Sequence, residues 1–186
     1  MERLTDRPVE EQNYWKPLLK KRNLKLEDMR VYDSGSCITF NSYRKGPERV
    51  LSNLHGCKIQ YEDKVFHSAE AIYFYLLTTQ YPRIQEDILK FRDGRAVKNY
   101  MCGQPKDSDW EQKAYSAMRT ALRAKAESCG PFRYYLINTG DIDLVEDAAW
   151  CDIKWGCKEK DNHYYGINAT GRLLMELRES LRNQSK

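Results

Sequence analysis

A small set of polar and aromatic residues in this chain has types and spacing that could do chemistry. Asp152 stands three residues before Trp155 and Gly156, and Gly166 and Asn168 follow shortly before a helical pattern. An indole ring can stack on a base, and an amide can bond a ribose or a phosphate. The set therefore indicates a pocket rim that holds a nucleotide. The same residues are also typical of a sharp turn that carries no chemistry.

Glu70 is the first candidate for a catalytic carboxylate. It lies in the stretch "SAEAIYFYLLTTQ", in which Ser68 is a candidate helix cap and apolar residues occupy nearly every face. A helix this apolar is buried, so we expect Glu70 near the core. A carboxylate there could stabilise a developing positive charge or take part in proton transfer. The alternative is an acid that only stabilises the start of its own helix.

The residues around the turn have similar pairs of interpretations. Asp152 could orient a water molecule or hold ribose hydroxyls, or it could simply form the turn. Trp155 could stack on a base or pack in the core. Gly156 lets backbone approach a ligand. Asn168 could bond the ligand where a helix N-terminus favours an anion, or it could serve as a plain helix cap.

Length and composition describe a globular chain. It has 186 residues, of which 41% are hydrophobic and 31% charged, with a formal net charge of +4. This length suits one domain with a sizeable core. The mild positive charge suits a phosphate-bearing ligand without requiring a nucleic-acid groove. No apolar run approaches the roughly 18 residues that span a bilayer, and the charged start predicts no signal peptide.

The cysteine pattern argues against a structural zinc site. The six cysteines form no C-x-x-C pair, and the three histidines do not cluster with them. We expect an intracellular protein with reduced thiols and no metal or cofactor. Phosphate-loop, dinucleotide-fingerprint, zinc-protease and nucleophile-elbow motifs are also absent from the sequence.

The coarse pattern of elements predicts an α+β fold, mostly helical with a small β component. Residues 36–40 read as a strand and residues 57–68 as a hairpin. Residues 1–35 read as a separate extension, with a short helix up to Trp15 and a basic stretch broken by Pro17. The charged segment 158–163 is predicted to bulge into solvent or to reach a larger substrate.

Two later segments give clear helical patterns. In 108–128, Ser108 and Glu111 predict a capping box. Seven residues of this segment recur at three- and four-residue steps and so form one face of the helix. They are Trp110, Ala114, Ala117, Met118, Ala121, Leu122 and Lys125. The final segment is amphipathic, with Leu173, Leu174, Leu177 and Leu181 facing inward.

Seven segments in order resemble one known family. They are "ITF", "LSNL" at 51–54, "VFHSAEAIYF" with Glu70, Trp110 with "ALRAK" at 121–125, "INTGDIDLVED", "D-x-x-WG" at 152–156, and "GIN-x-x-G-x-LLMELR" at 166–178. Together they are similar to the NADAR domain, also called the YbiA-like family. The resemblance covers about residues 36–182, so we expect one YbiA-like domain over 36–186 after an extension over 1–35.

The resemblance implies an N-glycosidase, which cleaves the bond between a ribose carbon and a nitrogen. Relatives act on ribosylamino pyrimidine phosphates of riboflavin synthesis or on ADP-ribose attached to guanine in nucleic acid. Carried over to this chain, it implies Glu70 and Asp152 as catalytic residues. It implies that Ser52, Asn53, Trp110, Trp155, Gly156 and Asn168 bind the substrate. The expected partners are an ADP-ribose-like or ribosyl-phosphate ligand and ADP-ribosylated DNA or RNA.

Two positions depart from the family pattern. Many relatives carry a lysine seven residues after this glutamate, where the chain has Leu77, and a histidine where it has Ala71. Lys64 or Lys98 could replace the missing lysine. These departures concern rate and substrate more than fold.

Three readings therefore stay open. The first is an active N-glycosidase on a ribosylated heterocycle. The second is a binder of ADP-ribose or NAD-derived compounds that lost turnover, which Leu77 favours. The third is a nucleic-acid-binding protein that uses the basic stretch "KPLLKKRNLK", and it predicts an affinity that falls steeply with salt.

Overall fold

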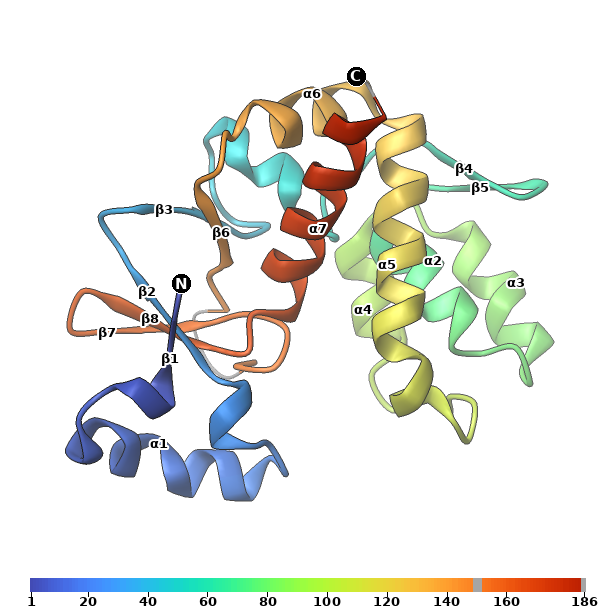
Figure 1. Cartoon of the computed structure of the whole chain (residues 1–186). Helices are drawn as coiled ribbons and strands as arrows, with labels where there is room; N and C mark the ends of the chain where they lie inside the picture. The colour runs from blue at the N-terminus through green and yellow to red at the C-terminus, as the bar shows by residue number, and fades with distance from the viewer. Residues whose placement is uncertain (149–151, 185–186) are drawn as a thin grey trace. The chain divides into compact units, whose positions relative to one another are not determined.

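The computed structural model describes residues 1–148 and 152–184, and Cys151 lies outside them. The chain divides into two compact units, one of residues 1–41 and 139–175, the other of residues 42–138 and 176–186. Helices predominate in the described residues, and the strands form small sheets, which confirms the predicted α+β class. Figure 1 labels the elements, and each unit is described by itself below. The predicted boundary at residue 35 stays a prediction.

The first unit is built on two small sheets. One sheet has the order β1-β2-β8-β7 with antiparallel neighbours. In the other, β3 runs parallel to β6, with Cys37 opposite Asp143. The bounds of these strands are β1 Glu2–Arg3, β2 Arg30–Asp33, β3 Cys37–Phe40, β6 Asp143–Glu146, β7 Lys158–Lys160 and β8 His163–Gly166. The strand expected over 36–40 is thus confirmed as β3.

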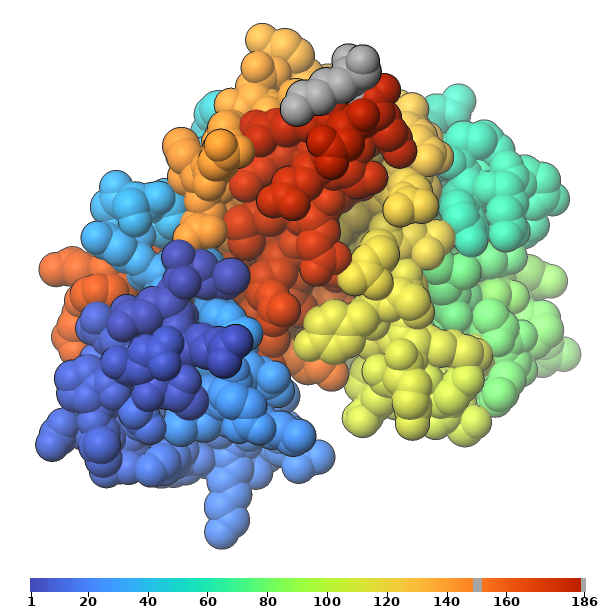
Figure 2. Space-filling model, viewed as in Figure 1, coloured from blue at the N-terminus to red at the C-terminus, as the bar shows by residue number. Residues whose placement is uncertain are grey.

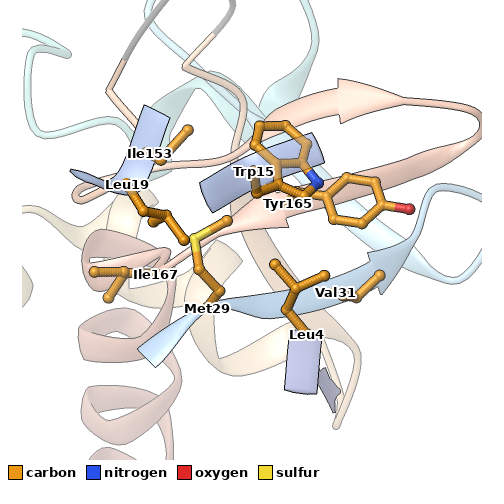
Figure 3. Close-up of a cluster of buried hydrophobic side chains, with 8 residues drawn as sticks. All are labelled: Leu4, Trp15, Leu19, Met29, Val31, Ile153, Tyr165 and Ile167. Carbon is orange, nitrogen blue, oxygen red and sulfur yellow. The ribbon is translucent and has the colours of Figure 1, made fainter. Parts of the chain in front are cut away.

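Helix α1 (Val9–Lys21) supplies the apolar cover of this unit, between the short 3-10 turns η1 (Leu4–Asp6) and η2 (Leu26–Asp28). Trp15 and Leu19, four residues apart, lie on its buried face. Figure 3 shows the ring of Trp15 beside that of Tyr165. The two rings are stacked, and their centroids are 5.0 Å apart. The prediction that this helix ends near Trp15 was wrong. The helix continues through Pro17 because burying this face outweighs the one hydrogen bond that proline removes.

The segment 158–163, predicted to bulge into solvent, forms strand β7, the turn and the first residue of β8, and its residues Glu159, Asp161 and Asn162 are exposed. Its turn residues Asp161 and Asn162 have φ angles of 50° and 60°. Asp and Asn tolerate this left-handed region, and such turns match the twist of paired strands. The charged run "KEKDNH" has no apolar alternation, so its sequence pattern does not indicate strands.

In the second unit, helix α2 packs against α3, α4 and α5. Its elements are η3 Pro47–Leu51, β4 Ile59–Tyr61, β5 Lys64–Phe66, α2 Ala69–Leu76, α3 Pro82–Lys90, α4 Gly94–Tyr100, α5 Trp110–Ser128 and α6 Gly130–Asn138. The predicted hairpin over 57–68 is confirmed as β4–β5. Helix α2 packs mainly on α5, whose predicted inward face is buried from Ala114 through Lys125.

Of the two helix caps predicted in this unit, one is confirmed and one is wrong. Ser68 caps α2 by accepting a hydrogen bond from the Ala71 amide at 3.2 Å, as expected. The capping box at Ser108 was wrong, because α5 begins at Trp110 without a side-chain cap. The chain enters this helix from Asp107, whose backbone carbonyl accepts from the Trp110 amide at 3.0 Å. The buried carboxylate of Asp107 bonds Thr79 and Gln80, which fixes the entry one residue later.

Helix α7 (Ala169–Asn183) confirms the predicted inward face, since all four of its named leucines are buried. Its carboxyl-terminal turns lie against α5, and Arg119 pairs with Glu176 at 2.9 Å. Figure 2 shows these two segments in contact, red against yellow. In the described part of the chain, no helix combines the length and apolar character that crossing a bilayer requires.

Candidate active site

The first turn of α2 places Glu70 in the core of the second unit. Ser68 ends the preceding extended segment and caps the helix, so Glu70 is the second helical residue. Its side chain is 4% exposed, and Ala69, Ala71 and Ile72 around it are also buried. This confirms the expectation that Glu70 lies near the core. A carboxylate in this place is shielded from bulk water, which strengthens its effect on nearby charge.

Asn53 holds Glu70 from the loop between η3 and β4. The Asn53 side-chain amide donates to the Glu70 Oε2 atom. In return, the Glu70 backbone amide donates to the Asn53 carbonyl at 3.0 Å. Two reciprocal bonds fix both the backbone and the carboxylate of Glu70 relative to this loop. The structure thus brings together two of the residues that the sequence singled out.

Ser52 is buried beside Asn53 and organises the loop itself. Its Oγ accepts from the Leu54 amide at 3.3 Å, and its carbonyl accepts from the His55 amide at 3.0 Å. Gly94 at the start of α4 lies so close that a Cβ there would be 2.7 Å from the Leu54 carbonyl oxygen. A side chain at residue 94 would displace this loop, so glycine is required by close approach.

Lys125 contacts the loop at Ser52, although the sequence analysis did not assign it to the site. It is fully buried on α5, and its Nζ donates at 2.7 Å to the carbonyls of both Val50 and Ser52. Burial lowers the pKa of Lys125 to about 8. The signal was present in the sequence, since Lys125 falls on the apolar stripe of its helix. A lysine in such a stripe is buried with partners or reaches outward, and periodicity alone does not distinguish the two.

In the described part of the chain, Trp110 takes part in none of the hydrogen bonds given above for Glu70, Asn53 and Ser52. It is the first residue of α5 and is half-buried, and Lys106 Nζ lies 5.3 Å from its ring centroid. An indole beside a cation gains a modest electrostatic attraction. Its predicted role in binding substrate stays a prediction.

In the first unit, Asp152 forms a side-chain-capped turn. Its Oδ1 accepts from the amides of Lys154 at 3.3 Å and Trp155 at 3.1 Å. The Gly156 amide donates to the Asp152 backbone carbonyl at 2.9 Å. Aspartate favours such turns because its short side chain mimics a backbone acceptor. The turn-forming interpretation of Asp152 is therefore realised, and a catalytic role would use the same carboxylate.

Asn168 is fully buried, with both polar atoms bonded to β6. Its Nδ2 donates to the Leu144 carbonyl at 2.8 Å, and its Oδ1 accepts from the Glu146 amide at 3.1 Å. The next two amides, of Ala169 and Thr170, donate to the carbonyls of Lys154 and Trp155, both at 3.0 Å. The start of α7 is thus tied to β6 and to the turn at Asp152.

Gly156 completes this arrangement by close backbone approach. A Cβ there would lie 2.5 Å from the Glu146 carbonyl oxygen and 2.8 Å from the Ala148 Cβ. The Cys157 amide donates to the same Glu146 carbonyl at 2.7 Å. Glycine is thus required for the close approach of this segment to β6. This structural requirement is independent of the predicted role of Gly156 in binding a ligand.

The predicted residues are distributed over the two units. Ser52, Asn53 and Glu70 belong to the second unit, and Asp152, Trp155, Gly156 and Asn168 belong to the first. Within residues 1–148 and 152–184, no group of three or more His, Cys, Asp or Glu side chains could hold a metal ion. The contacts around Glu70 support the chemistry of an oriented, buried carboxylate.

Comparison with known proteins gives the same family over most of the chain. The NADAR domain matches residues 39–182. The N-glycosidase YbiA of Escherichia coli is 40% identical over 82 residues, which are 42% of this chain and 46% of that protein. An N-glycosidase of Nostoc punctiforme is 36% identical over 75 residues, which are 40% of this chain and 46% of that protein.

A longer match and a solved structure extend the similarity. A riboflavin biosynthesis protein of Vibrio vulnificus is 30% identical over 143 residues, 73% of this chain and 36% of that protein. An NMR structure of Escherichia coli YbiA superposes with a TM-score of 0.68 at 26% identity, covering 81% of this chain and 87% of that one. In these sequence comparisons the chain spans less than half the length of the curated relatives it matches.

Proposed function

The chain belongs to the NADAR domain family, and we propose that it is an N-glycosidase that hydrolyses the bond between a ribose carbon and a heterocycle nitrogen. The observation that carries this proposal is the Glu70 carboxylate, buried at the start of α2 and held by Asn53. The names of the YbiA and Nostoc relatives support the reaction class.

A fixed carboxylate can stabilise positive charge and transfer a proton, and this reaction needs both. As the bond breaks, its electron pair leaves with the heterocycle nitrogen and positive charge builds on the ribose ring. The Glu70 carboxylate stabilises that charge and accepts a proton from the attacking water, whose oxygen bonds the ribose carbon. The proton that Glu70 accepts is then passed to the departing nitrogen, so that one water molecule is divided between the two products and the carboxylate is restored. Because Asn53 holds Glu70 in advance, the stabilisation costs little reorganisation during the reaction.

Two substrate classes fit this chemistry. One is ADP-ribose attached to guanine in nucleic acid, and the other is a ribosylamino pyrimidine phosphate, which the name of the Vibrio relative supports. Both place a phosphate near a ribose that carries a flat heterocycle. The predicted roles of Asp152, Trp155 and Asn168 remain part of this proposal and are tested separately from that of Glu70.

The alternative is a binder of ADP-ribose or an NAD-derived compound without turnover. It is favoured by Leu77, which stands at the position where the family resemblance implies a lysine and is fully buried at the end of α2. Glu70 and Asp152 oppose this alternative, because a binder without turnover has no need of catalytic carboxylates.

The test is release of the heterocycle by the wild-type protein. It is incubated with a guanine-ADP-ribosylated DNA oligonucleotide and, separately, with a ribosylamino pyrimidine phosphate, and the products are identified by mass spectrometry. Turnover on either substrate supports the glycosidase and selects its substrate class. No turnover on both, with ADP-ribose still bound in calorimetry, would reject the enzyme for these substrates and leave the binder.

A further inference from the structure

Lys125 is a buried cation with an unusual set of partners. It lies on α5 with no exposed surface, and its Nζ donates at 2.7 Å to the carbonyls of Val50 and Ser52. The Nζ atom also lies 4.6 Å from the ring centroid of Phe132 on α6. Both carbonyls belong to the end of η3 and the loop that follows it. One side chain of α5 thus fixes two successive turns of that segment.

We propose that Lys125 is the positioning residue of the site, which holds the loop at residues 50–54 so that Asn53 orients the Glu70 carboxylate. The proposal rests on the function proposed above, since it assigns Lys125 an effect on the reaction through Glu70. Among the described residues, the hydrogen bonds of the Lys125 ammonium group run to the backbone carbonyls of Val50 and Ser52, so its proposed effect on the substrate is indirect.

The hydrogen bonds provide a continuous path for this effect. Lys125 holds the Ser52 carbonyl, which also accepts from the His55 amide at 3.0 Å. Asn53, the next residue, binds Glu70 through its side chain and its carbonyl. A rotation of the peptide unit that joins Ser52 to Asn53 would move both of these contacts. Side chains that fix such a unit determine how precisely a catalytic group is placed.

The cost of burying Lys125 separates this role from a simple contribution to stability. Burial lowers the pKa of Lys125 to about 8, while nearby Cys57 and Cys129 act in the opposite direction. The folded protein thus pays to keep this ammonium group away from water. A methionine of similar length would avoid that cost but would remove the donor from the Val50 and Ser52 carbonyls. We therefore expect loop order, rather than the fold, to depend on Lys125.

The variants Lys125→Met and Lys125→Gln test the inference, with Arg123→Met as the matched control. Arg123 is an exposed cation two residues away on the same helix. Urea unfolding first establishes that each variant folds. Hydrogen exchange by NMR then follows the amides of His55 and Glu70, which bond the loop, and that of Ala71, which bonds Ser68 instead.

In Lys125→Met we expect the His55 and Glu70 amides to exchange at least about tenfold faster, and the Ala71 amide to stay unchanged. On whichever substrate the wild type turns over, kcat should fall about tenfold or more while ADP-ribose affinity stays within about threefold. Lys125→Gln, whose amide can still donate, should fall between wild type and methionine in both measurements. Arg123→Met should match the wild type.

Several outcomes would overturn the inference. Unchanged exchange at His55 and Glu70 would show that Lys125 does not hold the loop. A Lys125→Met chain that fails to fold would make the residue structural instead. Faster exchange together with unchanged kcat would show that loop order does not reach Glu70. A wild type without turnover rejects the proposed function but leaves the exchange result as an independent test of the loop.

Discussion

Asn53 and Glu70 are joined by two hydrogen bonds that run in opposite directions. The Asn53 side chain donates to the carboxylate, and the Glu70 backbone amide donates to the Asn53 carbonyl. Both residues are more than nine-tenths buried, so water does not replace either bond readily. The two bonds fix the orientation of the Glu70 carboxylate at the start of α2.

Replacing Asn53 with alanine should therefore weaken both the fold and the reaction. The variant leaves a buried carboxylate without this donor, which should lower the free energy of unfolding by about 1.5–3 kcal/mol in urea titrations. Asn99→Ala, an exposed asparagine on α4, is the control and should change it by less than about 0.5 kcal/mol. Equal effects of the two substitutions would mean that the Asn53 contact adds little.

The low pKa of Lys125 predicts a pH dependence of stability. Because its folded-state pKa of about 8 lies below its ordinary value of 10.5, the unfolded chain binds more protons between these values. Lys125 therefore adds a contribution to the unfolding free energy that rises with pH through this window. Relative to Lys125→Met, the wild type should gain about 1 kcal/mol between about pH 7 and pH 9.

Titratable groups near Lys125 limit the pH range over which this comparison can be made. Burial raises the pKa of Cys57 to about 12, so stability that depends on its neutral thiol is lost above its ordinary value of 9. His55 and Arg49 lie nearby as well, and burial followed by the charge of Lys125 lowers the pKa of His55, which keeps it neutral in this window. A difference between wild type and Lys125→Met that stays flat to about pH 9 would contradict the assignment.

Gly156 should not tolerate a side chain. In Gly156→Ala the added Cβ would meet the Glu146 carbonyl oxygen at 2.5 Å, backbone that cannot move aside cheaply. We expect a loss of about 1–3 kcal/mol in unfolding free energy. Gly130→Ala at the start of α6 is the control, because a Cβ there meets nothing within 4 Å, and it should be neutral or stabilising. A neutral Gly156→Ala would refute the close approach.

The variant Asp152→Asn distinguishes the role of Asp152 in forming the turn from its predicted role in the reaction. Asparagine keeps the Oδ1 acceptor that bonds the Lys154 and Trp155 amides, so the thermal midpoint should stay within a few degrees of the wild type, about 4 °C at most. If the carboxylate also serves the reaction, kcat should fall by about tenfold or more. Unchanged turnover in this stable variant would assign Asp152 to the turn alone.

The sequence was sufficient where local chemistry decides the outcome. The apolar run after Ser68 predicted both the cap and the burial of Glu70, since a helix with apolar residues on every face has to be covered. The stripe on α5 likewise predicted the buried face from Ala114 to Leu122, whereas for Lys125 the periodicity alone did not distinguish burial from reaching outward. The final helix and the strand at 37–40 follow from equally local patterns.

The sequence was insufficient where distant segments compete for a residue. The contact of Asn53 with Glu70 spans 17 positions and depends on the intervening hairpin. The capping box at Ser108 was locally plausible, but Asp107 bonds Thr79 and Gln80 and moves the helix start. The hairpin β7–β8 is stabilised by pairing with β2, which no pattern within its own charged residues could reveal.

The most direct test of the central claim is single-turnover release of the heterocycle by Glu70→Gln beside the wild type. Glutamine keeps the size of the side chain and removes its charge, so the fold and ADP-ribose binding should persist. On the substrate that the wild type hydrolyses, we predict a rate lower by about 10²–10⁴-fold. A variant that folds, binds and releases the heterocycle at the wild-type rate would contradict the account, because the reaction would then not use the carboxylate that Asn53 holds.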